Sequence, residues 1–351
     1  MTNQISAKTS NYLFVPANSV EEPRLLDFAA AAWPDRPADQ VLSSWWRRAE
    51  PHCAVAAIHQ KTGAMAGICG GRPSQWKIGD REVSAVAICE WYVAPGHEGK
   101  ALGKRMVRSF TTPDNFLYAF SLTQAAVDYL KVLGWRGPWQ ATLLALPLPR
   151  LVKVPLSLFS GRAGAELRDH IVTNGQLSKA LCVDLDRIEL VRTRPAHMRR
   201  DSKEWSWRLS FRPDLTYHIC IAYRSDEPIG YVAVRRLTPD RSRLLRRLDA
   251  ALIIDLVVVD DDRQVLRVLT RRAVAIAGEL NTRVVVATTT VARYANALAS
   301  QGFISSSFPI VGRFMKRVTP QFMWSPQGPG AEIDERNITI TFADSDVDMV
   351  L

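Results

Sequence analysis

Short apolar runs separated by polar turns recur along the first half of the chain, and longer amphipathic segments lie between them. Runs of roughly four to eight apolar residues bounded by turn residues are typical of strands, whereas a spacing of three or four is typical of helices. The pattern predicts strands over 11–17, 54–59, 64–70, 83–93, 116–120 and 143–148, and helices over 21–32, 101–110 and 123–132. Ser19, with Glu22 three residues later, is placed to cap the first helix.

The second half shows the same succession of short apolar runs and amphipathic segments. It predicts strands over 180–183, near 209, and over 218–223, 229–236, 251–259, 284–288 and 337–342, the last at a sheet edge. Helices are predicted over 185–194, 265–280 and 291–299.

The two halves also match residue by residue at several points. Pro51 corresponds to Pro213, Glu90 to Asp255 and Gly134 to Gly302, so that subtraction gives offsets of 162, 165 and 168. A nearly constant offset indicates a duplicated domain. We therefore predict an α/β fold of two tandem domains, 1–150 and 178–351, joined by a connector over 151–177. Each domain is expected to have a mixed, mostly antiparallel central sheet flanked by helices.

The composition is that of an ordinary globular protein, with 47% apolar and 23% charged residues. No apolar run approaches the ~20 residues of a membrane helix, and residues 1–10 lack the apolar core of a signal peptide. We expect a cytoplasmic chain with no membrane span. The five cysteines are scattered and none has metal-ligand spacing, so no metal site is expected.

The net charge of +10, with arginines concentrated in the second half, favours an anionic partner. A nucleotide cofactor, an acidic carrier protein, an acidic polymer and a membrane surface all have suitable charge. Nucleic acid is not expected, because the chain shows no recognition-helix, zinc or base-stacking motif. The pattern leaves the oligomeric state open.

The sharpest local signal is a turn rich in small residues, from Val93 to Lys104, that joins a predicted strand to a predicted helix. It reads Val-Ala-Pro-Gly-His-Glu-Gly-Lys-Ala-Leu-Gly-Lys. Free backbone N–H groups at a helix N-terminus attract anions, and small residues let phosphate oxygens approach the backbone. Lys100 and Lys104 add positive charge. The alternative is a turn that simply needs glycine.

The first half resembles the GNAT superfamily of N-acetyltransferases, whose acyl-CoA loop reads Arg/Gln-x-x-Gly-x-Gly/Ala after a Val-x-Pro strand end. Val93-Ala94-Pro95 and Gly103 match this loop, whereas Glu98 replaces the usual Arg or Gln and Ala101 replaces the middle Gly. Leu133-Gly134-Trp135 resembles the family's Leu-Gly-Phe ending. The resemblance implies two tandem GNAT-like domains and a site for acetyl-CoA or another acyl-CoA. Its binding residues would be Val93, Gly99, Lys100, Ala101, Leu102, Gly103 and Lys104.

The tandem layout also resembles bacterial GNAT-like proteins linked to capsule and exopolysaccharide biosynthesis. The matching features are a Trp-x-Arg element before the strands, the Gly134-Trp135 ending and Asp344-Ser345-Asp346 near the C-terminus. This resemblance implies a sugar or another small molecule as the acyl acceptor. Several tryptophans are candidates to line a sugar or acyl site: Trp45, Trp46, Trp91, Trp135 and Trp139.

Acyl transfer to an amine needs a base for the ammonium proton and an acid for the departing thiolate. Glu90 lies in an apolar strand just before the loop, where a carboxylate is costly unless it is paired or functional. We interpret Glu90 as the candidate base or acceptor-orienting group, and Tyr92 as a second catalytic candidate. Trp91 and Asp255, the repeat partner of Glu90, are candidates for substrate contact. The tyrosine that the family often uses is replaced by Leu130 and, in the repeat, by Leu298.

In the second half the corresponding turn reads Asp260-Asp261-Asp262 and has no glycine. Three carboxylates oppose phosphate binding, so one acyl-CoA site is expected, in the first half. Three functions stay open at this point. They are a GNAT-type acyltransferase acting on an amine of a sugar or small molecule, a catalytically silent tandem fold that binds a sugar intermediate or a protein, and a transferase that takes an aminoacyl group from tRNA.

Overall fold

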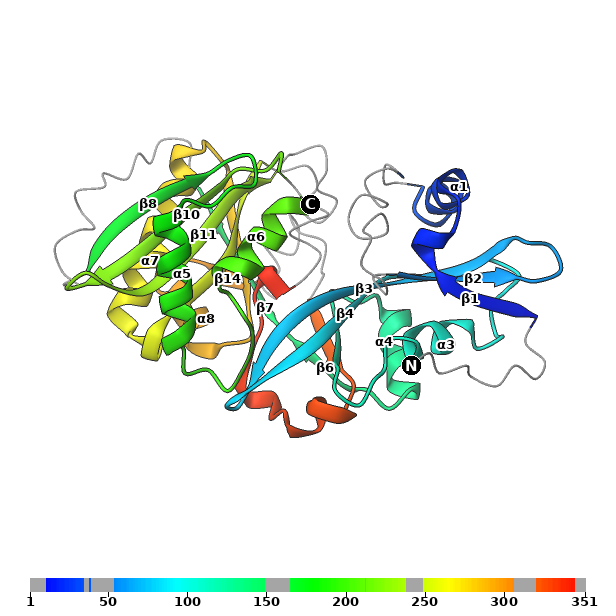
Figure 1. The fold of residues 1–351 in the computed structure, drawn as a ribbon. Helices are drawn as coiled ribbons and strands as arrows, with labels where there is room; N and C mark the ends of the chain where they lie inside the picture. Colours follow the sequence, from blue (N-terminus) through cyan, green and yellow to red (C-terminus); the bar gives the residue numbers. More distant parts are fainter. Residues whose placement is uncertain are drawn as a thin grey trace.

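Two β-sheets, each covered by helices on both faces, lie side by side in the protein (Figure 1). The computed structural model describes residues 11–34, 38, 54–148, 165–211, 213–237, 249–305 and 320–344. Every helix in these ranges is too short or too polar to cross a membrane. The predicted α/β class with two helix-flanked sheets is confirmed.

The first sheet has the order β1-β2-β3-β4-β5-β15-β6. Its strands are β1 (Tyr12–Pro16), β2 (Ala54–His59), β3 (Met65–Ile78), β4 (Arg81–Val93), β5 (Phe116–Phe120), β6 (Arg136–Gln140) and β15 (Gln321–Trp324). Neighbours along this order pair antiparallel except β4 and β5, which run parallel. Helix α1 (Glu22–Ala32) packs on one face, and α3 (Leu102–Arg108) and α4 (Gln124–Val132) pack on the other.

The second sheet has the order β14-β7-β13-β12-β11-β10-β8, in which only β12 and β13 are parallel. Its strands are β7 (Thr142–Pro147), β8 (Glu166–Val172), β10 (Tyr217–Arg224), β11 (Glu227–Leu237), β12 (Ala250–Val258), β13 (Val284–Thr289) and β14 (Ile304–Ser305). Helices α5 (Lys179–Val191) and α6 (Ser202–Phe211) pack on one face. Helices α7 (Arg263–Glu279) and α8 (Ala292–Ala299) pack on the other.

The two sheets exchange strands. β7 follows the strands of the first sheet in sequence but lies between β13 and β14 of the second sheet. In return, β15 follows every strand of the second sheet and lies between β5 and β6 of the first. The predicted connector over 151–177 also contains β8, an edge strand of the second sheet. The described strands therefore do not divide between the sheets at a single point in the sequence.

A long hairpin of β3 and β4 joins the two domains (Figure 1). Its far end pairs with β9 (Ala196–Met198), and β9 pairs in turn with β16 (Ile338–Thr339). Trp76 of the hairpin and Met198 of β9 are both buried in one apolar cluster. The hairpin thus carries strand pairing from the first sheet to segments that flank the second.

Some sequence predictions were wrong for local reasons. Residues 180–183 begin α5 rather than a strand, because Ser178 caps the helix at Leu181 N and apolar residues recur at helical spacing. The residues near 209 belong to α6. Ser19 lies in a 3₁₀ turn, η1 (Ala17–Ser19), where its hydroxyl donates to Pro16 O instead of capping α1.

The tail also differs from its prediction. The strand predicted over 337–342 is reduced to β16, which pairs with β9 between two 3₁₀ turns, η6 (Glu335–Asn337) and η7 (Phe342–Asp344). Two further 3₁₀ turns are η4 (Val259–Asp261) and η5 (Gly328–Glu332).

Candidate active site where two strands part

The parallel strands β4 and β5 separate in the middle of the first sheet. They pair only from Ala85 with Phe116 to Ala87 with Tyr118. Beyond this point β4 continues to Val93 without β5 as a partner. The two strands therefore separate next to the loop that leads into α3.

A bulge interrupts β4 at the opening. Cys89 pairs with Gly70 and Tyr92 pairs with Ile68, so two residues of β4, Glu90 and Trp91, lie opposite one residue of β3. Glu90 has a φ of 44°, in the left-handed region that a residue with a side chain rarely adopts. The half-buried Glu90 thus lies where the bulge changes the direction of the strand, and the regular alternation of side chains is broken between Glu90 and Tyr92.

The two aromatic residues after Glu90 face opposite sides of the sheet. The Trp91 ring centroid lies 5.2 Å from that of Tyr129 on α4. A Cβ added at Gly103 would lie 2.7 Å from Trp91 Cζ2, so this glycine is required by its contact with Trp91. Tyr92 lies on the α1 side, with ring centroids 5.9 Å from Phe28 and 5.7 Å from Trp33.

The loop after β4 leaves the start of α3 open. Ala101 is the N-cap residue, has a φ of 56° and makes no side-chain cap, so the first backbone N–H groups of α3 have no intrahelical partner. The left-handed φ explains why glycine is usual in this motif at the position of Ala101. Lys100 Nζ donates to Gly96 O at 3.0 Å, so the Lys100 ammonium group lies against the loop backbone. Lys104 is half-buried in the first turn of α3.

The counterpart in the second domain is filled by its own side chains. β12 and β13 also part, after Ile253 and Ala287, but the buried Tyr294 hydroxyl accepts from Val258 N at 3.2 Å. Asp262 Oδ1 accepts from the first-turn N–H groups of α7, Gln264 N at 2.8 Å and Val265 N at 3.2 Å.

Ion pairs hold the aspartates of this second opening in place. A hydrogen bond from Arg224 to Asp262 holds the pKa of that carboxyl below its ordinary value. Asp261 pairs with Arg194 and Arg293. The carboxylate of Asp262 therefore occupies the position at a helix N-terminus where a phosphate would bind.

Asp255, the repeat partner of Glu90, lies in a buried ion-pair cluster instead of at an exposed substrate surface. Arg200 Nε donates to Asp255 Oδ2 at 2.6 Å, and Arg200 Nη2 lies 2.7 Å from Asp344 Oδ1. Tyr231 and Thr341 also donate to Asp255, which is 1% exposed. Burial alone would raise the pKa of Asp255, but the positive charges of Arg200 and Arg192 outweigh it and lower this pKa.

Other residues singled out from the sequence contribute less to the site. Trp135 is buried in the core beside α4, and Trp139 stacks near Trp324 with ring centroids 6.4 Å apart. Trp45, Trp46, Ser345 and Asp346 lie outside the described residues.

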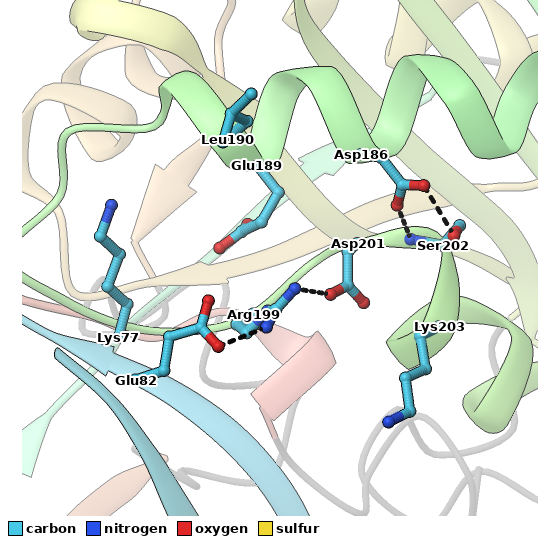
Figure 2. Close-up of a pocket in the computed structure, with 9 residues that line it drawn as sticks. All are labelled: Lys77, Glu82, Asp186, Glu189, Leu190, Arg199, Asp201, Ser202 and Lys203. Atoms are coloured by element: carbon cyan, nitrogen blue, oxygen red, sulfur yellow. Dashed lines mark hydrogen bonds and ion pairs between the residues drawn. The ribbon is translucent and has the colours of Figure 1, made fainter.

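A groove separates the β3–β4 hairpin from α5 and α6. One cavity of about 360 Å³ is shown in Figure 2 and is lined by Lys77, Glu82, Asp186, Glu189, Leu190, Arg199, Asp201, Ser202 and Lys203. An adjoining cavity of about 230 Å³, the inner groove, is lined by Pro73, Ser74, Gln75, Arg199, Asp201, Lys203, Glu204 and Trp207. Arg199 pairs with both Glu82 and Asp201, so it spans the hairpin and the start of α6 (Figure 2).

The inner groove leads to the point where β4 and β5 part. Arg72 pairs with Ala87 in the sheet, and its Nη2 lies 3.3 Å from the Tyr118 hydroxyl. Ala87 and Tyr118 form the last pair of β4 and β5. The Arg72 guanidinium lies 5.9 Å from the centroid of the Trp207 ring, and Trp207 packs on the apolar cluster that includes Cys89 and Tyr92.

Sequence reasoning did not identify this groove. The tryptophan–arginine element at 205–208 is the local sequence feature that lies nearest to it. The structure places Glu90, the loop residues and the groove around one opening, and it places Asp255 in a separate buried cluster.

Replacing Arg200 by Met should lower the free energy of unfolding by about 3–5 kcal/mol, because Asp255 and Asp344 would be left buried without their cation. Urea unfolding of the purified variants measures the change. Arg336→Met is the matched control, because Arg336 pairs with Asp334 at an exposed site and should change stability by at most about 1 kcal/mol. Equal losses in both variants would contradict the role assigned to the buried cluster.

Known proteins support the fold that this geometry indicates. A family model described as the acetyltransferase (GNAT) family matches residues 19–112, which include β4, the loop and α3. Among curated protein sequences, none matches this chain.

Three solved structures have a similar fold at low sequence identity. A "probable N-acyltransferase" from Enterococcus faecalis has a TM-score of 0.53 and 10% identity, covering 86% of this chain and 69% of its own. A GCN5-related N-acetyltransferase from Anabaena variabilis has a TM-score of 0.52 and 10% identity, covering 89% and 72%. N-myristoyltransferase from Saccharomyces cerevisiae, with bound myristoyl-CoA, has a TM-score of 0.52 and 12% identity, covering 92% and 80%. Residues 19–112 thus match the acetyltransferase (GNAT) family, and the described chain has a GNAT-type fold with two related domains.

Proposed function

We propose that the protein is an N-acyltransferase that moves an acetyl or longer acyl group from acyl-CoA to an amine of a sugar or another small molecule. The observation that supports this most directly is the contrast between the two halves. The opening between β4 and β5 has no capping side chain at α3, whereas its counterpart is filled by Tyr294 and Asp262. A single acyl-CoA per chain is therefore expected.

The residues around the opening suit the parts of such a donor. The loop backbone at Gly99, Lys100 and Ala101, with the first turn of α3 and Lys104, would hold the phosphates. The end of β4 at Val93 and the stretch before it that does not pair with β5 would hold the amide groups of the donor arm. Acyl-CoA supplies a thioester, whose sulfur is a good leaving group.

Glu90 is the proposed acceptor-orienting residue. It lies in the bulge, and a carboxylate there attracts the ammonium form of an amine before transfer. Tyr92, two residues later, is the proposed proton donor for the leaving sulfur, on the α1 side of the sheet. The sugar acceptor rests on the resemblance to GNAT-like proteins of capsule and exopolysaccharide biosynthesis, and the acyl length is left open by the myristoyl-CoA seen in a structure of the same fold.

Calorimetric titration with acetyl-CoA should give one site per chain. Lys104→Glu should weaken binding by roughly 10- to 100-fold, because a charged hydrogen bond is worth about 1.5–3 kcal/mol. Arg267→Glu makes the same charge reversal on the exposed face of α7 and should leave affinity unchanged. Lys104 is a better position for this test than Gly103, because any side chain at Gly103 would displace Trp91. Two sites per chain, or equal weakening by both variants, would argue against the assignment.

Glu90→Gln should raise the KM for the acceptor by about 10- to 100-fold through the loss of one charged interaction. The affinity for acetyl-CoA should stay the same. Thiol release from acetyl-CoA is measured with glucosamine, ethanolamine and putrescine as acceptors. Glu227→Gln, at an exposed hairpin of the second domain, is the control. An unchanged KM in a folded Glu90→Gln variant would remove Glu90 from the site.

A further inference from the structure

The inner groove contains the buried carboxylate of Glu204, one oxygen of which has no hydrogen-bond donor among the described residues. Glu204 lies in the first turn of α6, is 9% exposed and lines the inner groove. Its Oε1 has no hydrogen-bond partner in the part of the chain that the structure describes. Arg208, one turn later, forms only a long ion pair with it, with Nη2 at 3.8 Å. A buried carboxylate oxygen is costly unless a ligand or partner satisfies it.

The helix start holds Glu204 in place. Asp201 Oδ1 accepts from Glu204 N at 2.9 Å, and Asp201 is itself paired with Arg199. Trp207 lies three residues after Glu204, so the two side chains share one face of α6. Trp207 reaches the Cys89–Tyr92 cluster, and Arg72 lies beside both Trp207 and the last pair of β4 and β5. Ser74 lines the same groove as Glu204, and its hydroxyl lies 3.3 Å from that of Tyr118, in the last pair of β4 and β5. Glu204 therefore lines the groove that reaches the opening.

We propose, building on the acyltransferase function above, that Glu204 takes the proton from the acceptor ammonium and that the acceptor enters through the inner groove. The ammonium gives one proton to the Glu204 carboxylate, and the nitrogen lone pair then forms a C–N bond with the acyl carbon. The C–S bond breaks and Tyr92 gives its hydroxyl proton to the thiolate. The second nitrogen proton then restores the Tyr92 hydroxyl. Glu204 returns its proton to solvent, so the products are an amide, a free thiol and one proton.

The surroundings of Glu204 suit a base. Burial raises the pKa of Glu204, and the negative Asp201 adds to this effect, whereas Arg208 on α6, Arg72 on β3 and Arg200 before α6 oppose it. The net direction is upward, which makes the carboxylate a stronger base nearer neutral pH. The three arginines favour the ionised form, which is the form that accepts a proton.

The groove also indicates the class of acceptor. Its wall combines the carboxylates of Asp201 and Glu204 with the cations Arg199 and Lys203, and Trp207 adds an aromatic face. A volume of about 230 Å³ suits a small polar molecule that carries a primary amine. The second domain thus completes the active site of the first, although its own donor site is filled.

The test compares wild type, Glu204→Gln and Glu204→Asp in thiol release from acetyl-CoA with the same three amines. Glu204→Gln should lower kcat by about 10²–10⁴ with unchanged affinity for acetyl-CoA, and the acidic limb of the kcat/KM profile should disappear. Glu204→Asp should keep that limb and part of the rate. Hydroxylamine, which is already neutral at pH 7, should lose far less rate in Glu204→Gln.

Glu227→Gln is the control for replacing a carboxylate by an amide, and thermal unfolding checks that every variant is folded. A folded Glu204→Gln variant that transfers within threefold of wild type, or that keeps the acidic limb, overturns this inference alone. A wild type that binds acetyl-CoA but releases thiol with none of the amines overturns the proposed function and this inference together. A rate loss equal for hydroxylamine and for ethanolamine also overturns the role as base.

Discussion

The buried guanidinium of Arg200 is the interaction on which the arrangement of the two domains depends. It binds Asp255 on β12 and Asp344 in η7, and Asp344 also presents its carbonyl oxygen to Arg72 on β3. Charges buried this deeply are stable only when all partners are present, so the cluster fixes β12, the tail and the start of α6 relative to the hairpin. The position of Glu204 in the inner groove follows from that constraint.

The two halves show how one fold is kept open or closed by a few side chains. Both central strand pairs part, after Ala87 in one sheet and after Ile253 in the other. In the second domain, Tyr294 fills the gap, whereas the 168-residue offset places Ala126 at the same point of α4. An alanine in place of this tyrosine, and the absence of a capping side chain at α3, distinguish the first domain from the second.

Local periodicity was sufficient for most of the strands and helices, because each one buries its own apolar face. It also identified the loop from Val93 to Lys104, whose glycines and lysines are adjacent in sequence. It missed the bulge at Glu90, because a bulge appears only when two strands are paired. It also missed Glu204, which comes to the site only through pairing of the hairpin with β9 more than a hundred residues away. Contacts between distant segments carry no signal in a local pattern.

The exchange of β7 and β15 makes the two domains inseparable. During synthesis, β15 emerges after every strand of the second sheet. The first sheet therefore lacks the strand between β5 and β6 until the second sheet has been made. A gene cut between the halves would yield two products that each lack a strand of their own sheet. The second domain is therefore retained for the strand it supplies to the first sheet and for the strand it takes from it, whatever ligand it binds.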